Sequence, residues 1–100
     1  MKAYGRVMKA VLLAAMVFGA AAAQAAGDAA AGAEKAKSCA SCHGLDGKGR
    51  IHLAGKKAGY LEEQLRAFRS GVRKEAMMNM MAKSLSDQDI ADLAAYFASK

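Results

Sequence analysis

The segment Cys39-Ala40-Ser41-Cys42-His43 decides how this 100-residue chain is interpreted. Two cysteines three positions apart, followed directly by a histidine, have the spacing that attaches a c-type haem. In a helix the two thiols lie about one turn apart, so both sulfurs can reach the vinyl groups of one porphyrin, and His43 lies beneath the iron. The segment therefore predicts one haem c per chain, held by thioethers from Cys39 and Cys42 and ligated through its iron by His43.

Two other kinds of site use the same Cys-x-x-Cys spacing, namely dithiol redox centres and zinc sites. A zinc site needs a fourth ligand, and the other candidate of the usual kind is His52, with no second cysteine pair in the chain. A thioredoxin-like centre needs a βαβ pattern, whereas no segment here alternates apolar and polar residues as a strand does. The sequence favours haem and leaves a thiol-disulfide oxidoreductase as the weaker alternative.

Residues 1–25 have the features of a cleavable signal peptide. Three basic side chains in residues 1–9 precede an apolar run over 10–18, and Ala23-Gln24-Ala25 offers small residues where a signal peptidase cuts. The apolar run is shorter than the roughly 20 residues that span a bilayer, so no stable membrane span is expected after cleavage. We expect export to the periplasm, where bacteria attach covalent haem, and one domain over residues 26–100.

The composition of the expected mature chain suits a small cofactor-centred domain. The first 25 residues hold three of the 15 basic side chains and no acidic one, which leaves 12 basic against 9 acidic side chains. So modest a positive charge, together with export, argues against nucleic acid as a partner. A chain this short buries too little apolar surface to be comfortably stable alone. We therefore expect a haem at the centre of the fold, and favour a monomer.

The apolar periodicity predicts an all-α fold of three to five short helices. Ranges 29–37, 60–70 and 86–97 have helical patterning and no proline, whereas glycine-rich residues 44–50 predict a loop. Asp28 is placed to cap the first helix, Gly71 to end the second and Ser86-Asp87-Gln88-Asp89 to form a capping box for the last. In that last helix the side chains spaced for one apolar stripe are Ile90, Leu93, Ala94 and Phe97.

Four methionines between the second and last helices are candidates for a second iron ligand. They are Met77, Met78, Met80 and Met81. A c-type haem that shuttles electrons generally has a second axial ligand, and a thioether serves that purpose. Methionines also fill irregular apolar gaps, so at least three of the four are expected to be packing.

Several segments together resemble bacterial class I cytochromes c, in particular the small periplasmic single-haem domains of the c4 and c553 type. The resemblance runs from Gly27-Asp28 to Phe97. The segments that carry it are Cys39-x-x-Cys42-His43-Gly44-x-Asp46-Gly47, Leu53-Ala54-Gly55, Tyr60-Leu61-x-x-Gln64-Leu65-x-x-Phe68-Arg69-x-Gly71-x-Arg73 and Leu85-Ser86-Asp87-x-Asp89-Ile90-x-x-Leu93-Ala94-Ala95-Tyr96. The resemblance implies the class I cytochrome c fold wrapped around one haem.

The resemblance also implies the axial ligands and the support of the histidine. In the family the methionine ligand lies seven residues before the leucine that here is Leu85, which selects Met78 and leaves Met81 as packing. Family members carry prolines in the loop after the haem motif, and this chain has Ile51 at the aligned position. In the family the carbonyl at this position accepts the proton of the second histidine nitrogen and fixes its tautomer. Ile51 offers a carbonyl to His43 without the rigid ring.

The function implied is single-electron transfer between periplasmic redox partners by a non-enzymatic carrier, or by the haem subunit of an oxidoreductase complex. A group of basic side chains in this sequence predicts a redox partner with an acidic docking surface. These side chains are Lys56, Lys57, Arg66, Arg69, Arg73 and Lys74. The alternative in another class is a haem-based sensor or small-ligand binder with a labile sixth ligand. His52 is expected to be an ordinary loop histidine.

Overall fold

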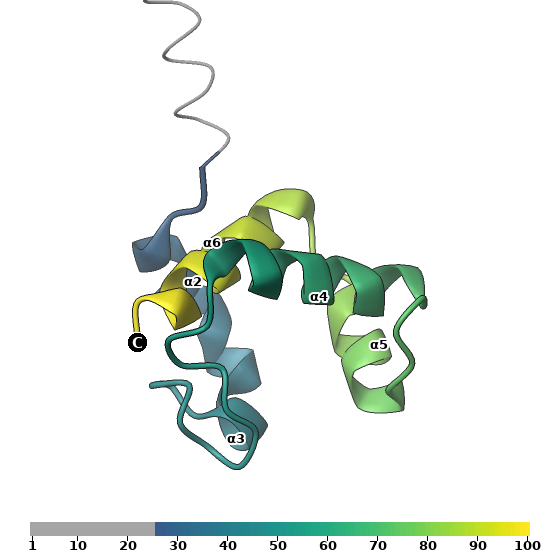
Figure 1. Ribbon diagram of the computed structural model, residues 1–100, viewed down its shortest axis with the longest axis horizontal. Helices are drawn as coiled ribbons and strands as arrows, with labels where there is room; N and C mark the ends of the chain where they lie inside the picture. The colour runs from purple at the N-terminus through teal and green to yellow at the C-terminus, as the bar shows by residue number, and fades with distance from the viewer. Residues whose placement is uncertain (1–25) are drawn as a thin grey trace, which may run out of the picture.

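The computed structural model describes residues 26–100 of the chain, and within that range it contains helices and loops but no strand. In chain order the elements are α2 (Ala29–Lys35), the 3-10 helix η1 (Ala36–Cys39), α3 (Ala40–His43), α4 (Ala58–Ser70), α5 (Ala76–Lys83) and α6 (Asp87–Ala98) (Figure 1). The all-α fold expected from the sequence is confirmed. The expected signal peptide falls on residues 1–25 and lies outside the described part of the chain.

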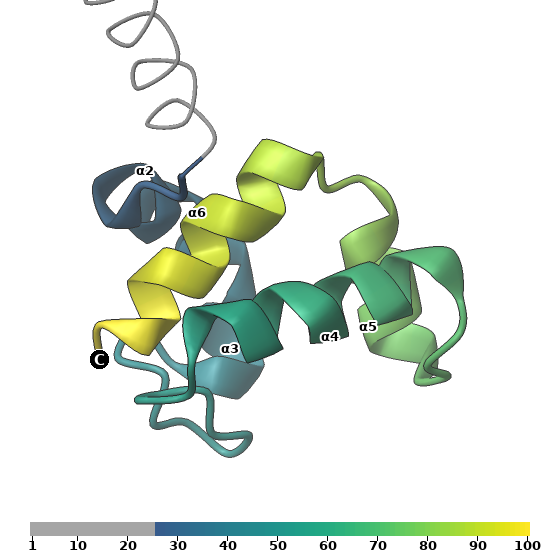
Figure 2. The same cartoon turned by 45° about the horizontal axis from the view of Figure 1, so that its top comes forward.

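α6 is the central element, with α2 packed against one side and α4 against another (Figures 1 and 2). The predicted apolar stripe Ile90, Leu93, Ala94 and Phe97 is buried along its whole length. α4 contributes Leu61 and Phe68, which are also buried. The spacing of three and four residues therefore does place one face of each helix in a common core.

The crossing of α2 and α6 depends on a glycine. A Cβ atom added at Gly32 would lie 2.1 Å from the Asp92 backbone oxygen, well inside van der Waals contact. Only a residue without a side chain lets the two backbones come this close. The first and last helices of the described chain are thereby held in direct contact.

The helix ends follow the capping residues read from the sequence, with two differences. Asp28 Oδ1 accepts from the Ala30 amide at 2.9 Å, and Ser86 and Asp89 form the complete capping box of α6. α4 begins two residues earlier than expected, at Ala58, and ends at Ser70, with Gly71 as its C-cap at a φ of 83°. The expected first helix tightens after Lys35 into η1, so the haem motif begins in a 3-10 turn.

The loop from residue 44 to residue 57 is tied back to α3 and α6. Two amides of the loop, those of Leu53 and Ala54, donate to the Gly47 carbonyl at 2.8 and 3.1 Å. The Tyr96 hydroxyl of α6 donates to the Leu45 carbonyl. This loop is therefore a fixed wall of the domain.

Within residues 26–100 no helix is long and apolar enough to cross a membrane.

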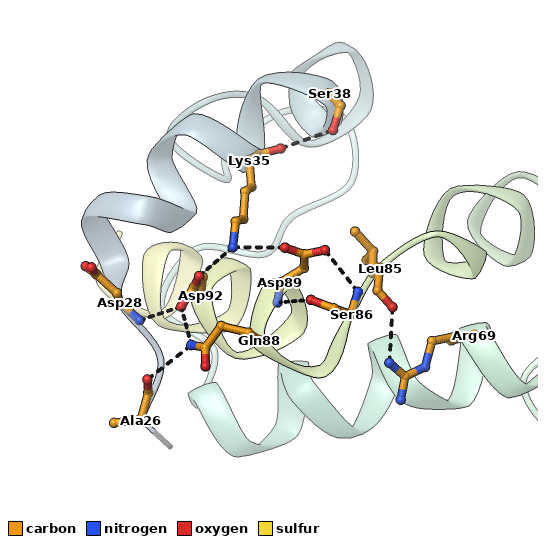
Figure 3. Close-up of polar contacts among 10 residues, drawn as sticks. All are labelled: Ala26, Asp28, Lys35, Ser38, Arg69, Leu85, Ser86, Gln88, Asp89 and Asp92. Carbon is orange, nitrogen blue, oxygen red and sulfur yellow. Dashed lines mark hydrogen bonds and ion pairs between the residues drawn. The ribbon is translucent and has the colours of Figure 1, made fainter. Parts of the chain in front are cut away.

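A buried carboxylate, Asp92, joins α6 to α2 (Figure 3). Its side chain is 2% exposed and accepts from Lys35 Nζ at 2.6 Å and from the Asp28 amide at 2.8 Å. Gln88 Nε2 donates to the same carboxylate at 2.8 Å and to the Ala26 carbonyl at 3.3 Å. The hydrogen bond from Lys35 and that from Asp28 lower the pKa of Asp92 to about 2.

This low pKa predicts that acid weakens the domain. The folded state binds the Asp92 proton less tightly than the unfolded chain, whose ordinary pKa is 3.8. The stabilisation is therefore complete above about pH 4 and is lost as the pH falls through about 2. Asp92→Asn should lower the free energy of unfolding at pH 7 by about 2 kcal/mol and flatten its decline below pH 4. Urea unfolding at several pH values measures both, and an equally steep decline in the variant would contradict this assignment.

Candidate functional site

One cavity of about 560 Å³ opens between the haem motif, α4, α5 and α6. In Figure 1, α3 and α5 lie beneath opposite ends of α4, and the cavity takes side chains from both. Its wall is largely apolar, with residues such as Leu61, Leu65 and Phe68 from α4. Leu93, Ala94 and Phe97 supply the α6 side.

The three residues of the motif that are expected to bind haem, Cys39, Cys42 and His43, all line this cavity. Cys39 ends η1, and Cys42 and His43 lie in the short helix α3 that follows at once. Because η1 runs directly into α3, both half-buried thiols face the same cavity as the imidazole. The structure thus brings together the three residues that the spacing singled out.

His43 is held in one orientation by the loop that follows it. Its ring is 7% exposed, and Nδ1 lies 2.9 Å from the Ile51 carbonyl oxygen. A carbonyl only accepts, so Nδ1 carries the proton and Nε2 keeps its lone pair for a metal. The Ile51 amide donates to the Cys42 carbonyl at 3.1 Å, which holds the Ile51 carbonyl in place as the acceptor of this bond. The hydrogen bond expected at the position of the family's proline is present without the proline ring.

The loop approaches the haem motif closely because of a second glycine. The Gly49 amide donates to the His43 carbonyl at 2.8 Å. A Cβ at Gly49 would lie 2.7 Å from the carbonyl carbon of His43. The glycine-rich sequence therefore has a specific use here, which is to let Ile51 reach the imidazole. His52 lines the cavity and is exposed.

The methionine segment forms a helix, α5, that the sequence pattern did not identify. Met77, Met78 and Met81 line the cavity, whereas Met80 is 63% exposed and does not. Met78 is half-buried, and Met77 and Met81 are 55% and 36% exposed. The helix thus narrows the four candidates to three that face the cavity.

The start of α5 is fixed by two polar residues that the sequence pattern did not identify. Glu75 is the N-cap of α5, and its carboxylate accepts from the Met78 amide at 2.7 Å. Asn79 bonds both to α4 and to the loop before α5. The signal that could have located them is an acidic residue followed by Asn four positions later at the start of an apolar run.

The environment of Cys39 disfavours a reactive thiolate. Burial raises the pKa of the Cys39 thiol above its ordinary value, with only a smaller opposing effect from Ser38. Thiol-disulfide enzymes instead have a Cys-x-x-Cys thiol whose pKa is lowered. Residues 26–100 also lack the strands of a βαβ unit. Both observations favour cofactor attachment over thiol exchange.

Three of the six predicted basic side chains show two different placements in the structure. Lys56 and Arg73 line the mouth of the cavity, where Arg73 stacks on the Phe68 ring at 4.5 Å and donates to Gln64 at 2.7 Å. Arg69 is instead bound to the Leu85 carbonyl at 3.1 Å and to Asp87 at 2.7 Å. Arg69 thus joins α4 to the start of α6, which lessens its part in any docking surface.

The cavity fits a porphyrin by the chemistry of its walls. A haem needs a wide apolar slot, cysteine thiols at its vinyl edge, an imidazole with a ring nitrogen left for the iron, and a second ligand. The walls supply each of these, and the cationic Lys56 and Arg73 lie at the rim, where haem carboxylates can reach solvent. A helical domain with this set of groups around one apolar cavity belongs to the class of c-type haem proteins.

Comparison with known proteins gives the family. The sequence profile of cytochrome c matches residues 29–100. Cytochrome c-554(548) of Halomonas halodenitrificans is 50% identical over 82 residues, which cover 75% of this chain and 99% of that protein. Cytochrome c4 of Pseudomonas aeruginosa is 48% identical over 82 residues, which cover 78% of this chain and 41% of that protein. The chain belongs to the cytochrome c family, and it is an electron-transfer haem protein carrying covalent haem c.

The solved structures agree with this assignment. Reduced recombinant cytochrome c4 from Pseudomonas stutzeri superposes with a TM-score of 0.70 at 41% identity, over 75% of this chain and 46% of that one. The class I cytochrome fold expected from the resemblance is therefore confirmed. The chain spans less than half the length of the two cytochrome c4 relatives and nearly all of the Halomonas protein.

Proposed function

We propose that this chain is an exported, periplasmic, single-haem electron carrier with histidine and methionine as axial iron ligands. Cys39 and Cys42 form the two thioethers, His43 ligates one face of the iron and Met78 the other. The leader over residues 1–25 is removed after Ala25, and the mature domain works as a monomer. The protein catalyses no reaction of its own, and serves either as a free carrier or as the haem subunit of an oxidoreductase complex.

The observation that carries this proposal is the state of His43 within the shared cavity. Its Nδ1 donates to the Ile51 carbonyl at 2.9 Å, so Nε2 is the ring nitrogen left to bind a metal. Cys39, Cys42 and Met78 line the same cavity. Among the four methionines, Met78 combines a cavity position with partial burial and a backbone amide that is itself held by Glu75.

Each residue has a defined part in this function. When bound, the haem supplies an iron that cycles between ferrous and ferric states. Because the Ile51 carbonyl orients His43 and raises its donor strength, the imidazole keeps its position in both states. A thioether from Met78 is a weaker donor that favours the ferrous state. With both side chains in place, His43 and Met78 would leave small ligands no position on the iron.

Expression of the full chain in a host competent in cytochrome maturation tests the proposal. The mature protein should begin at Ala26, have the mass of the polypeptide plus one haem, and resist alkylation at both cysteines. Its oxidised spectrum should contain the weak far-red band of a thioether bound to ferric iron. A colourless product with two alkylatable thiols would refute the proposal. A haem-loaded product that binds carbon monoxide readily at neutral pH would favour the sensor class instead.

We further propose that the partner docks through an acidic surface at the mouth of the cavity. Lys56 and Arg73 are at this mouth, and Lys57 and Lys74 are exposed beside them in the chain. Attraction between these charges and an acidic partner speeds encounter and is screened by salt. The rate of electron transfer to an acidic redox partner should fall steeply between low and physiological ionic strength. A rate independent of salt in stopped-flow measurements would remove this part of the proposal.

A further inference from the structure

Asn79, the residue after Met78, uses its side chain to join three backbone segments. Its Nδ2 donates to the Phe68 carbonyl and to the Arg73 carbonyl, both at 2.8 Å. Its Oδ1 accepts from the Glu75 amide at 2.9 Å. The side-chain amide of Asn79 thereby uses both of its N–H donors, and its oxygen accepts one hydrogen bond.

Each of these three bonds goes to a backbone group at the junction of α4 and α5. Phe68 lies in the last turn of α4, and its carbonyl also accepts from the amide of the C-cap residue Gly71 at 3.2 Å. Arg73 lies in the loop between the helices, and Glu75 is the N-cap of α5. Asn79 therefore fixes the end of α4, the loop and the start of α5 relative to one another.

The same junction holds the backbone of Met78. Glu75 accepts from the Met78 amide at 2.7 Å through its carboxylate, while its own amide is held by Asn79. The two residues thus form a reciprocal pair across the first turn of α5. Displacement of the Met78 backbone away from the cavity would break its bond to Glu75.

Helix propensity alone does not account for an asparagine at this position. Asn is a poor helix former inside a helix because its side chain competes for backbone hydrogen bonds, and α5 spans only eight residues. A residue that is unfavourable for the local helix but is bonded to two other segments is better explained by what those bonds hold in place. What they hold is the element that carries Met78 into the cavity.

We propose that Asn79 is the positioning residue of Met78 and keeps its thioether on the iron against competing ligands. This inference rests on the ligand set given under Proposed function. Asn79 does not touch the iron; it acts by coupling α5 to the C-terminal end of α4. Its loss leaves the Arg73 carbonyl and the Glu75 amide without their side-chain partner and the Phe68 carbonyl with the Gly71 amide alone, and the ligand segment then opens more often.

The test measures how easily added imidazole displaces the methionine in the haem-loaded protein. In Asn79→Ala the apparent affinity for imidazole at neutral pH should rise about tenfold or more, because hydrogen bonds that resist opening are lost. The far-red band should weaken, and the reduction potential should fall. Asn79→Asp keeps the side-chain volume but faces two carbonyls with a carboxylate, so it should shift all three readouts in the same direction and serves if Asn79→Ala does not fold.

The matched control is Asp92→Asn, which weakens the α2–α6 contact away from this junction. It should lower the thermal midpoint while leaving imidazole affinity and the far-red band unchanged. If the Asn79 variants bind imidazole no better than this control, Asn79 is only structural and the inference is overturned. If instead the parent protein already lacks the far-red band, the proposed ligand set fails, and the inference fails with it.

Discussion

Met78→Ala should leave the haem attached and remove the far-red thioether band from the oxidised spectrum. The two thioethers and His43 do not depend on this side chain, so the mass of one haem remains. Without the weak sulfur donor the iron loses the ligand that favours its ferrous state, and the reduction potential should fall. The open position should bind carbon monoxide in the ferrous protein, which the parent should not. Visible spectroscopy and redox titration of the purified variant measure all of these changes.

Alanine substitution of the other methionines provides the controls. Met80 is 63% exposed and lies outside the cavity, so Met80→Ala should keep the band and the potential of the parent. Met77 and Met81 do line the cavity, and their alanine variants should keep the band with only small spectral shifts. Retention of the band in Met78→Ala together with its loss in Met77→Ala or Met81→Ala would move the ligand to that neighbouring position.

Substitution of both cysteines, Cys39→Ala with Cys42→Ala, should abolish stable folding of the mature chain. Without covalent attachment the haem is free to dissociate, and the cavity of about 560 Å³ then has nothing to fill it. This cavity opens to solvent, so its apolar wall, with Leu65 and Leu93 among its residues, would face water instead of a porphyrin. Each apolar side chain left unburied forgoes roughly 1.5–3 kcal/mol, and several together are comparable to the whole stability of a domain. We expect the far-ultraviolet circular dichroism of the double variant to show most of the helix signal lost.

The control for the double variant is Ser41→Ala, which lies between the two cysteines and is exposed. It should acquire haem normally and retain the helix signal of the parent. A double variant with native helix content and a cooperative thermal transition would show that the polypeptide holds its fold without the cofactor. The core formed by α2, α4 and α6 would then be sufficient by itself.

The parts of the fold that the sequence predicted are those governed by local rules. The stripe of α6, the Ser86 and Asp89 capping box and the Asp28 cap each depend on residues within one or two turns of a helix. The haem motif is equally local, because five consecutive residues place two sulfurs and an imidazole at the end of η1 and in the α3 turn that follows it. The hydrogen bond from His43 Nδ1 to the Ile51 carbonyl oxygen was expected from the family resemblance, and it is present with a length of 2.9 Å.

The parts that the sequence did not reveal depend on contacts between distant segments. α5 has no apolar periodicity of its own, since methionines occupy exposed and cavity-facing positions alike, and it is held to α4 by Asn79. In the sequence Arg69 cannot be distinguished from the other basic surface residues, because its bonds to Leu85 and Asp87 depend on the fold. Asp92 follows Ala91 within an apolar stripe, and only the fold provides its partners from α2.

The contact between α2 and α6 bears on how the proposed exported protein would mature. Gly32 and Asp92 are 60 positions apart in the chain, yet their backbones touch. If the chain is exported N-terminus first, as proposed above, Cys39 and Cys42 would reach the far side of the membrane before α6 does. Both thiols would then be open to haem attachment until α6 packs against α2.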